Sequence, residues 1–390
     1  MRTVLKPAIA VAVVCSLAVV ASPTTAAAEP APRSATATSR QADVHSGLPR
    51  PTGAHAVGRD VLHLVDEHRT DPWVPEAGAR QLMLSVHYPA WPGTGQPASY
   101  STTEEARLLL QRKAPGATVP AEVISGLHTH SRTDARPLPG RFPLVVLSPG
   151  LTLPRATLSS LAEDLASHGY VVALVDHTYE SSGTTFPDGR TLTCVICDQP
   201  PAGGPAAITR SRAADVSFVL DQLTGQHAAW RYAWLIDPER IGMAGHSIGG
   251  ASAATAMASD TRIRAGVNLD GTFREPVPST GLGGRPFLLL GSQADHTPGR
   301  DHTWDRDWPS LDGWKRWLTV AGADHGSFTD GPVLESLLGQ PATTELPAQR
   351  AVRITRGYVG AFFDLHLKGT RQPLLDGPTP ANPEVTFEQP

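Results

Sequence analysis

Short apolar runs alternate with longer, partly polar stretches along the chain from Val57 onward. The runs at 57–66 and 80–88 lie close together, and the second alternates as an antiparallel strand with one buried face does. The later runs are nearly all apolar, which is typical of strands buried on both faces of a parallel sheet. They lie at 143–147, 170–175, 241–244, 265–269, 286–290 and 317–321.

Helical patterns fill the intervals between these runs, at 156–167, 207–223, 249–258 and 348–368. In the last of them Ile354, Tyr358 and Phe362 recur at intervals of four, which makes an apolar stripe that would pack on a sheet. The alternation of strands and helices predicts an α/β fold. We expect a mostly parallel central sheet with an antiparallel N-terminal hairpin and helices on both faces.

The domain organisation follows from where this pattern starts and where it is interrupted. We expect one domain over 46–390, because the strand and helix pattern continues to the end of the chain without an internal repeat. The segment 91–141 interrupts the strand order and contains a predicted helix at 103–113. We expect this insertion to form a cap beside the functional site.

The first residues have the pattern of a secretory signal peptide. Arg2 and Lys6 precede an apolar stretch at 8–20, and small residues follow up to a cleavage site that would remove 1–28. The stretch is shorter than the ~20 residues that span a bilayer. Residues 29–45, rich in Ala, Pro, Ser and Thr, predict a disordered linker. The mature protein is therefore expected to be secreted.

Cysteine content and charge narrow the class of partner. Removal of the signal peptide leaves Cys194 and Cys197, an even pair that predicts a local disulfide in an oxidising compartment. Two sulfur ligands are too few for a structural zinc site.

The net charge is −4, and no long Lys or Arg run occurs, so we expect no nucleic-acid partner. A small-molecule partner fits this composition better.

The strongest chemical signal is the sequence Gly-His-Ser-Ile-Gly at 245–249. An apolar run precedes it and a helix of small residues follows it, as in the strand–turn–helix that exposes a nucleophilic serine above a sheet. A glycine-rich turn with an incidental serine is the alternative. The flanking elements favour Ser247 as a nucleophile.

A serine nucleophile needs a base, which in this chain order follows an acid. His325 comes directly after the last predicted strand, in a loop at the carboxyl edge of the sheet. Asp270 and Asp295 each follow a predicted strand and keep the order Ser, Asp, His. Asp324 adjoins His325 and should point away from it. The residues alone leave the acid open between Asp270 and Asp295, with Asp324 third.

Backbone amides at two positions are candidates for an oxyanion hole. One is the amide of Ile248, directly after the nucleophile, and the other is in the loop after the first parallel strand. That loop reads Ser-Pro-Gly-Leu at 148–151, and Gly150 permits a sharp turn that would aim the Leu151 amide inward. An ordinary strand-to-loop turn is the alternative.

These motifs resemble those of the platelet-activating factor acetylhydrolase family, the plasma-type and bacterial lipase-like branch of the α/β-hydrolase superfamily. The similarity is carried by the serine motif and by 143–151, 164–170, 269–271 and 325–330. The family has a histidine before the glycine of the oxyanion loop, where this chain has Pro149. The family also takes its acid from the strand before the usual one, so the resemblance favours Asp270 over Asp295.

The resemblance implies a calcium-independent carboxylic ester hydrolase, and a mechanism through serine and histidine needs no cofactor. Such a hydrolase would cleave short acyl esters, including those of phospholipids, with transient contact to a lipid interface. A broad lipase or polyester hydrolase is one alternative, and a non-catalytic α/β-hydrolase that only binds a ligand is another. Trp304 and Trp308 lie before His325 and are expected in the core, with an acyl-binding wall as the alternative.

Overall fold

The computed structural model describes residues 47–390. The predicted signal peptide 1–28 and linker 29–45 lie outside the described residues, so both stay predictions. Within 47–390, no helix combines the length and the apolar character that crossing a membrane requires. The chain from residue 47 to its end is built around one large sheet and a separate two-stranded ribbon.

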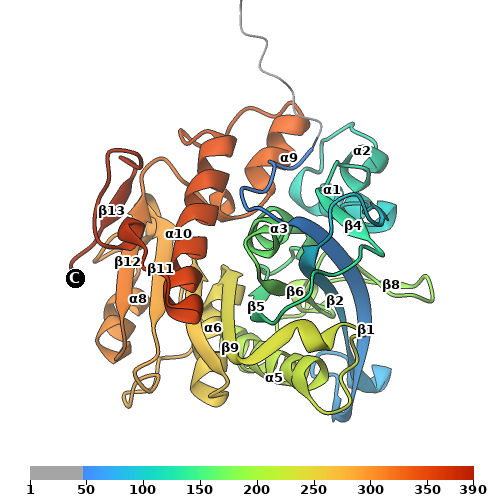
Figure 1. Ribbon diagram of the computed structural model, residues 1–390, viewed down its shortest axis with the longest axis horizontal. Coiled ribbons are helices and arrows are strands. Elements are labelled where there is room, and N and C mark those ends of the chain that lie inside the picture. The colour runs from blue at the N-terminus through green and yellow to red at the C-terminus, as the bar shows by residue number, and fades with distance from the viewer. Residues whose placement is uncertain (1–46) are drawn as a thin grey trace, which may run out of the picture. The chain divides into compact units, whose positions relative to one another are not determined.

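The large sheet has eleven strands in the order β13-β12-β11-β10-β9-β5-β6-β2-β1-β4-β3 (Figure 1). Neighbours in the central part pair in parallel, which confirms the mostly parallel sheet. These strands are β5 (Phe142–Ser148), β6 (Val171–His177), β9 (Ile236–His246), β10 (Ile263–Leu269), β11 (Phe287–Ser292) and β12 (Lys315–Val320).

The N-terminal hairpin is present and antiparallel, but the expected single buried face of its second strand is wrong. β1 (Ala56–Thr70) pairs with β2 (Ala79–Ala90), which also pairs antiparallel with β6. Because β2 lies inside the sheet, both of its faces are covered. Leu84 belongs to the core on one face, and Ser85 on the other is buried and accepts a hydrogen bond from Arg155.

Short edge strands complete the sheet and have no clear signal in the sequence. β13 (Val385–Phe387) pairs antiparallel with β12 at one edge. β3 (Gln96–Pro97) and β4 (Ser131–Thr133) lie at the other edge. The separate ribbon is formed by strands of two residues each, β7 (Thr184–Thr185) and β8 (Thr191–Leu192).

Helices cover both faces of the sheet, as expected (Figure 1). The apolar side chains of α3 (Ser159–Ser167) and α10 (Ala348–Lys368) form one core with strand residues such as Val145 and Leu147. Those of α5 (Gly204–Thr224) and α6 (Ile248–Ser259) form another with the alternate residues Leu144 and Val146. The alternation of β5 side chains between two cores explains why its sequence is continuously apolar.

The insertion 91–141 contains two helices, α1 (Thr103–Lys113) and α2 (Ala121–Ser125). α1 has the bounds expected from the sequence and begins with a capping box between Thr102 and Glu105. Its Leu109 packs with Leu334 of α9 (Gly331–Leu337), in an apolar cluster outside the two main cores. The remaining short helices are α4 (Val195–Asp198), α7 (Gln293–His296) and α8 (His302–Asp307).

Candidate active site

Ser247 lies in a sharp turn between β9 and α6, in a backbone conformation that is rare for a residue with a side chain. Its φ is 57° and its ψ is −125°. A Cβ atom at Gly249 would lie 2.1 Å from the main-chain oxygen of Ser148, and one at Gly245 would lie 2.3 Å from the carbonyl carbon of Gly249. The glycines on either side of the serine are therefore required by close backbone approach, as expected of a nucleophile turn.

Asp270 and His325 are joined by a short hydrogen bond. Asp270 directly follows β10 and is buried, and its Oδ2 lies 2.6 Å from Nδ1 of His325. His325 begins the 3₁₀ turn η5 (His325–Phe328) after β12, and 55% of its side chain is exposed. The strand ends thus bring the two residues together across 55 positions of sequence.

The environment of Asp270 keeps it ionised. Burial by itself would raise the pKa of the carboxyl group, but His296, His325 and the main-chain N–H of Ser292 outweigh that effect. The pKa is therefore held well below its usual range. An ionised carboxylate that accepts from Nδ1 of His325 leaves Nε2 as the free nitrogen, which is the form a general base requires.

The other two candidate acids are directed away from His325. Asp295 is exposed and accepts a hydrogen bond from Ser292 Oγ at 3.0 Å. Asp324 forms the capping box of η5 and accepts from Ser327 Oγ at 2.8 Å. Among the three acids, only Asp270 contacts His325 in the described residues.

Ser247 is adjacent to this pair but not hydrogen-bonded to it. Its main-chain N–H donates to the oxygen of Leu269, the residue before Asp270, at 2.8 Å. Within residues 47–390, no hydrogen bond joins the Ser247 hydroxyl to His325. Catalytic hydrogen bonds are often long before substrate binds, so this arrangement is compatible with a Ser–His pair.

His246, for which the sequence pattern gives no role, links the serine turn to the loop of His325. Its Nε2 donates to the main-chain oxygen of His325 at 2.7 Å, and the two rings lie 4.5 Å apart. Burial, assisted by the neighbouring His325, lowers the pKa of His246 to about 3. The ring is therefore neutral and acts as a structural donor.

The loop after β5 offers the second candidate oxyanion donor. In the described residues, neither the Leu151 amide nor the Ile248 amide donates a hydrogen bond to another protein group. The guanidinium of Arg212 fixes the start of this loop, since it donates to the main-chain oxygen of Pro149 and, at 3.1 Å, to Ser148 Oγ. The proline thus contributes its carbonyl to the anchoring of the loop.

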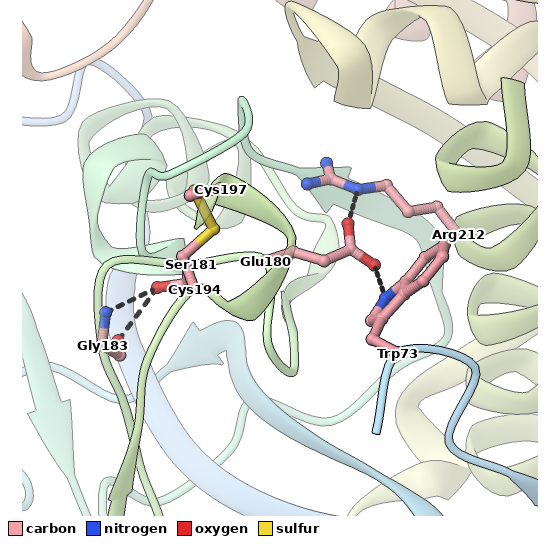
Figure 2. The surroundings of a disulfide bond; sticks show 7 residues. All are labelled: Trp73, Glu180, Ser181, Gly183, Cys194, Cys197 and Arg212. Atoms are coloured by element: carbon pink, nitrogen blue, oxygen red, sulfur yellow. Dashed lines mark hydrogen bonds and ion pairs between the residues drawn. A yellow bond between two sulfur atoms is a disulfide. The ribbon is translucent and has the colours of Figure 1, made fainter. Parts of the chain in front are cut away.

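Buried charges hold Arg212 in place. Glu180 accepts from Nε of Arg212 at 2.7 Å and, with its other oxygen, from the indole of Trp73 at 2.8 Å (Figure 2). Figure 2 also shows that this pair lies close to the disulfide segment. Since charges of opposite sign are paired here, the cost of burying them is offset.

A second Ser–His–Asp chain lies beneath the same loop. Ser148 Oγ is 2.9 Å from Nε2 of His177, whose Nδ1 is 2.7 Å from Oδ2 of Asp215. All three residues are buried, and burial together with the nearby Arg212 lowers the pKa of His177. Because no substrate can reach this serine, the chain serves to fix the loop. Sequence spacing gives no signal for it.

The predicted disulfide between Cys194 and Cys197 is present. Its segment borders the candidate site, because Cys194 packs in one apolar cluster with the side chains of Ile248 and Leu151. In the part of the chain that the structure describes, no group of three or more His, Cys, Asp or Glu side chains is placed to hold a metal ion.

A cavity of about 290 Å³ reaches His325 from the side of the insertion. Its apolar lining comes from the insertion, the loop after β5 and the α9 region: Leu109, Leu110, Ile124, Leu153, Leu334 and Leu338. Trp304 and Trp308 do not line it. Trp304 is fully buried and donates to the oxygen of Gly271 at 2.8 Å, so its placement in the core is confirmed and the acyl-wall alternative is wrong for it.

Comparisons with known proteins agree with this arrangement. Residues 98–190 and 223–368 match the family model described as platelet-activating factor acetylhydrolase, isoform II. A protein of Arthroderma benhamiae named a probable 1-alkyl-2-acetylglycerophosphocholine esterase is 30% identical, over 87% of this chain and 93% of that protein. A bis(hydroxyethyl) terephthalate hydrolase of Streptomyces coelicolor is also 30% identical, but over 40% of this chain and 41% of its own length.

The solved structure of a ferulic acid esterase from Streptomyces cinnamoneus is similar in both sequence and fold. It is 44% identical, with a TM-score of 0.79, and the match covers 88% of this chain and all of that one. The likeness confirms the α/β-hydrolase fold, and the relatives together show a carboxylic ester hydrolase. By the family model and by the Arthroderma relative, this chain belongs to the platelet-activating factor acetylhydrolase, isoform II, family.

Proposed function

We propose that the protein is a secreted serine esterase in which Ser247, His325 and Asp270 form the catalytic triad. The observation that carries this proposal is the 2.6 Å hydrogen bond between His325 Nδ1 and Asp270, at the strand end beside the Ser247 turn. An acid, a base and a strained serine on neighbouring strand ends are the parts that acyl transfer through serine requires.

In the proposed mechanism, His325 Nε2 takes the proton of Ser247 Oγ as that oxygen attacks the ester carbonyl carbon. The carbonyl oxygen becomes an oxyanion, which the amides of Leu151 and Ile248 stabilise. His325 then gives its proton to the departing alcohol oxygen, leaving an acyl ester on Ser247. Water attacks this ester with His325 again as base, which releases the acid and restores Ser247. Asp270 orients the imidazole and stabilises its charged form.

The proposed substrates are esters of small acids, with the acyl group in the cavity beside His325. Its volume of about 290 Å³ lies at the small end of the ~300–1,000 Å³ typical of ligand pockets. The name of the Arthroderma relative specifies an acetyl ester of a glycerophospholipid, which such a cavity would accommodate. Transient contact with a lipid interface would accompany that substrate.

Esters of aromatic acids are a second candidate, favoured by one specific observation. The ferulic acid esterase is 44% identical over 88% of this chain, whereas the Arthroderma relative is 30% identical over 87%. The bis(hydroxyethyl) terephthalate hydrolase, whose substrate is a small diester of an aromatic acid, matches a smaller part of the chain. Both relatives therefore support a soluble ester of an aromatic acid.

Secretion is part of the proposal and has two supports. The residues 1–28 carry the signal-peptide pattern, and Cys194 and Cys197 form a disulfide, a bond that persists in oxidising compartments.

Labelling with a fluorophosphonate probe and hydrolysis of a substrate panel test the proposal together. The probe should react at Ser247, and Ser247→Ala should remain folded, fail to label and lose ~10⁴-fold or more of the turnover. The panel consists of p-nitrophenyl acetate, methyl ferulate and a phospholipid with an acetyl group at sn-2. A folded Ser247→Ala protein with near-normal hydrolysis would refute the triad, and a wild-type protein that neither labels nor hydrolyses would instead indicate a non-catalytic binding protein.

A further inference from the structure

The helix α7, which directly follows β11, places a histidine beside Asp270. Asp295 of this helix is exposed, whereas the next residue, His296, is 4% exposed. By its place in the chain order, this segment could have supplied the triad acid. In the fold it supplies a buried imidazole that faces Asp270.

His296 lies between two carboxylates. Its Nδ1 is 3.0 Å from Oδ1 of Asp270, and its Nε2 is 3.3 Å from Oδ2 of Asp301. Both contacts are out of line with the ring N–H directions, so they are ion pairs more than directional hydrogen bonds. Each ring nitrogen lies within 3.3 Å of a carboxylate oxygen, so the positive charge of an imidazolium is attracted to both anions whatever the direction of its N–H bonds. Two flanking carboxylates therefore favour the doubly protonated ring.

The charged groups that face the ring are the two carboxylates just described, Asp270 at the end of β10 and Asp301 before α8. Trp304 of α8 and Trp317 of β12 complete its surroundings without charge. Burial lowers the pKa of His296, but the two carboxylates outweigh that effect and raise the pKa to about 9. The ring is a cation throughout the neutral range.

Packing leaves the imidazole little freedom to move. Its ring centroid is 4.1 Å from that of Trp304, and the indole of Trp317 donates to its main-chain oxygen at 2.6 Å. A Cβ atom at Gly291 would lie 2.8 Å from the Cβ of His296, so the β11 backbone approaches it closely.

The two oxygens of Asp270 thus have different partners. Oδ1 faces His296 and accepts from the N–H of Ser292 at 2.6 Å, while Oδ2 is left for His325. We propose that His296 is a positioning residue, a permanent imidazolium that fixes the rotation of Asp270 and partly neutralises it. The inference rests on the proposed triad. Without this cation the full negative charge of Asp270 would face His325, so removing the His296 charge should change the pH dependence of the reaction.

The test compares His296→Gln with a matched control, His302→Gln. His302 lies on nearby α8 with 90% of its side chain exposed and makes only a distant contact with Asp305, at 3.9 Å. Rates are measured on p-nitrophenyl acetate and divided by the concentration of active sites, which is determined by titration with a fluorophosphonate. For His296→Gln we expect kcat to fall ~10- to 100-fold with KM changed less than about twofold. The acid limb of the plot of kcat/KM against pH should shift to higher pH by ~0.5–1 pH unit. The control variant should match the wild type.

If His296 only supports the fold, His296→Gln would lower the melting temperature and the number of titratable sites but leave the acid limb unchanged. That result would overturn the proposal. If His296→Gln does not fold, ¹⁵N NMR of the imidazole nitrogens in Ser247→Ala decides the matter. Two protonated nitrogens on a buried ring at pH 7 are expected, and a neutral ring would refute the inference. Residual turnover in Ser247→Ala would instead refute the triad, so the two failures are distinguishable.

Discussion

The imidazole of His246 donates from Nε2 to the main-chain oxygen of His325, 2.7 Å away. On its other side, a Cβ atom at Gly150 would lie 2.7 Å from His246 Nδ1, so the loop after β5 also packs against this ring. The residue before Ser247 therefore contacts both the loop of His325 and the loop after β5, the two other segments of the proposed site.

From this contact we predict that His246→Ala lowers kcat/KM by about 10-fold. The reason is the loss of one buried hydrogen bond, worth ~1 kcal/mol, together with the cavity left beside the loop of His325. Hydrolysis of p-nitrophenyl acetate by wild type, His246→Ala and the exposed-site control His302→Ala measures it. Activity of His246→Ala equal to that of the control would show that the contact is dispensable.

The identity of the acid is tested by a pair of conservative substitutions. Asp270→Asn should leave KM nearly unchanged and reduce kcat ~10⁴-fold, because an amide stabilises the wrong tautomer of His325. Asp295→Asn should change kcat less than about threefold, since Asp295 contacts Ser292 Oγ and is exposed. The reverse ranking would assign the acid to the later strand.

The sequence could not decide between these acids from residue order, because both follow a strand of the same kind. What separates them is conformation: Asp270 has a φ of 57°, and the tight turn that it makes aims its carboxylate at the loop after β12. A Cβ atom at Gly271 would lie 2.1 Å from the oxygen of Ser247, so the glycine after Asp270 is required by contact with the neighbouring turn. Only the resemblance to a family, and not the pattern, favoured the strand end whose aspartate contacts His325.

Long elements with strong periodicity were predicted closely, and short ones were missed. α1 and α10 have the predicted bounds, since capping residues and an apolar stripe define them. The three-residue strands β4 and β13 have too few positions to show alternation. The roles of His246 and His296 depend on contacts between distant segments, which spacing in one sequence cannot reveal.

A buried acid near the site gives the stability a defined pH dependence. Asp330 accepts from the N–H of Ser160 at 3.2 Å and from the hydroxyl of Tyr100, a residue of the insertion, also at 3.2 Å. Burial raises the pKa of Asp330 to about 7 in spite of the hydrogen bond from Ser160. The folded state therefore holds this proton more tightly than the unfolded chain, whose aspartate pKa is ~3.9.

The sign of the effect follows from this difference. The stabilisation from protonated Asp330 is complete below pH ~4 and is lost as the pH rises toward 7, because the unfolded chain ionises first. Asp330→Asn cannot ionise. We predict that the melting temperature of Asp330→Asn, relative to wild type, rises by about 3 °C between pH 5 and pH 8, which corresponds to ~2 kcal/mol for a domain of this size. Differential scanning calorimetry at both pH values measures it, and a constant difference would show that Asp330 is ionised throughout.

The last prediction concerns the length of the acyl chain, which the cavity beside His325 should limit. An open groove would gain ~0.8 kcal/mol from each added methylene, or roughly a fourfold rise in kcat/KM per methylene. The cavity here is about 290 Å³ and is lined by side chains of the insertion and of the α9 region, including Leu110 and Leu338. We therefore expect p-nitrophenyl acetate and butyrate to be cleaved faster than the decanoate or palmitate.

Variants of the cavity wall make this prediction specific to the cavity. Leu110→Ala and Leu338→Ala enlarge it and should raise the ratio of decanoate to butyrate kcat/KM by several-fold. Val123→Ala is the matched control, because Val123 is exposed on the same insertion and does not line the cavity. If the wild-type rate instead climbs steadily to the long-chain esters and the wall variants behave like Val123→Ala, the acyl chain lies elsewhere, and the enzyme acts as a broad lipase through an open groove.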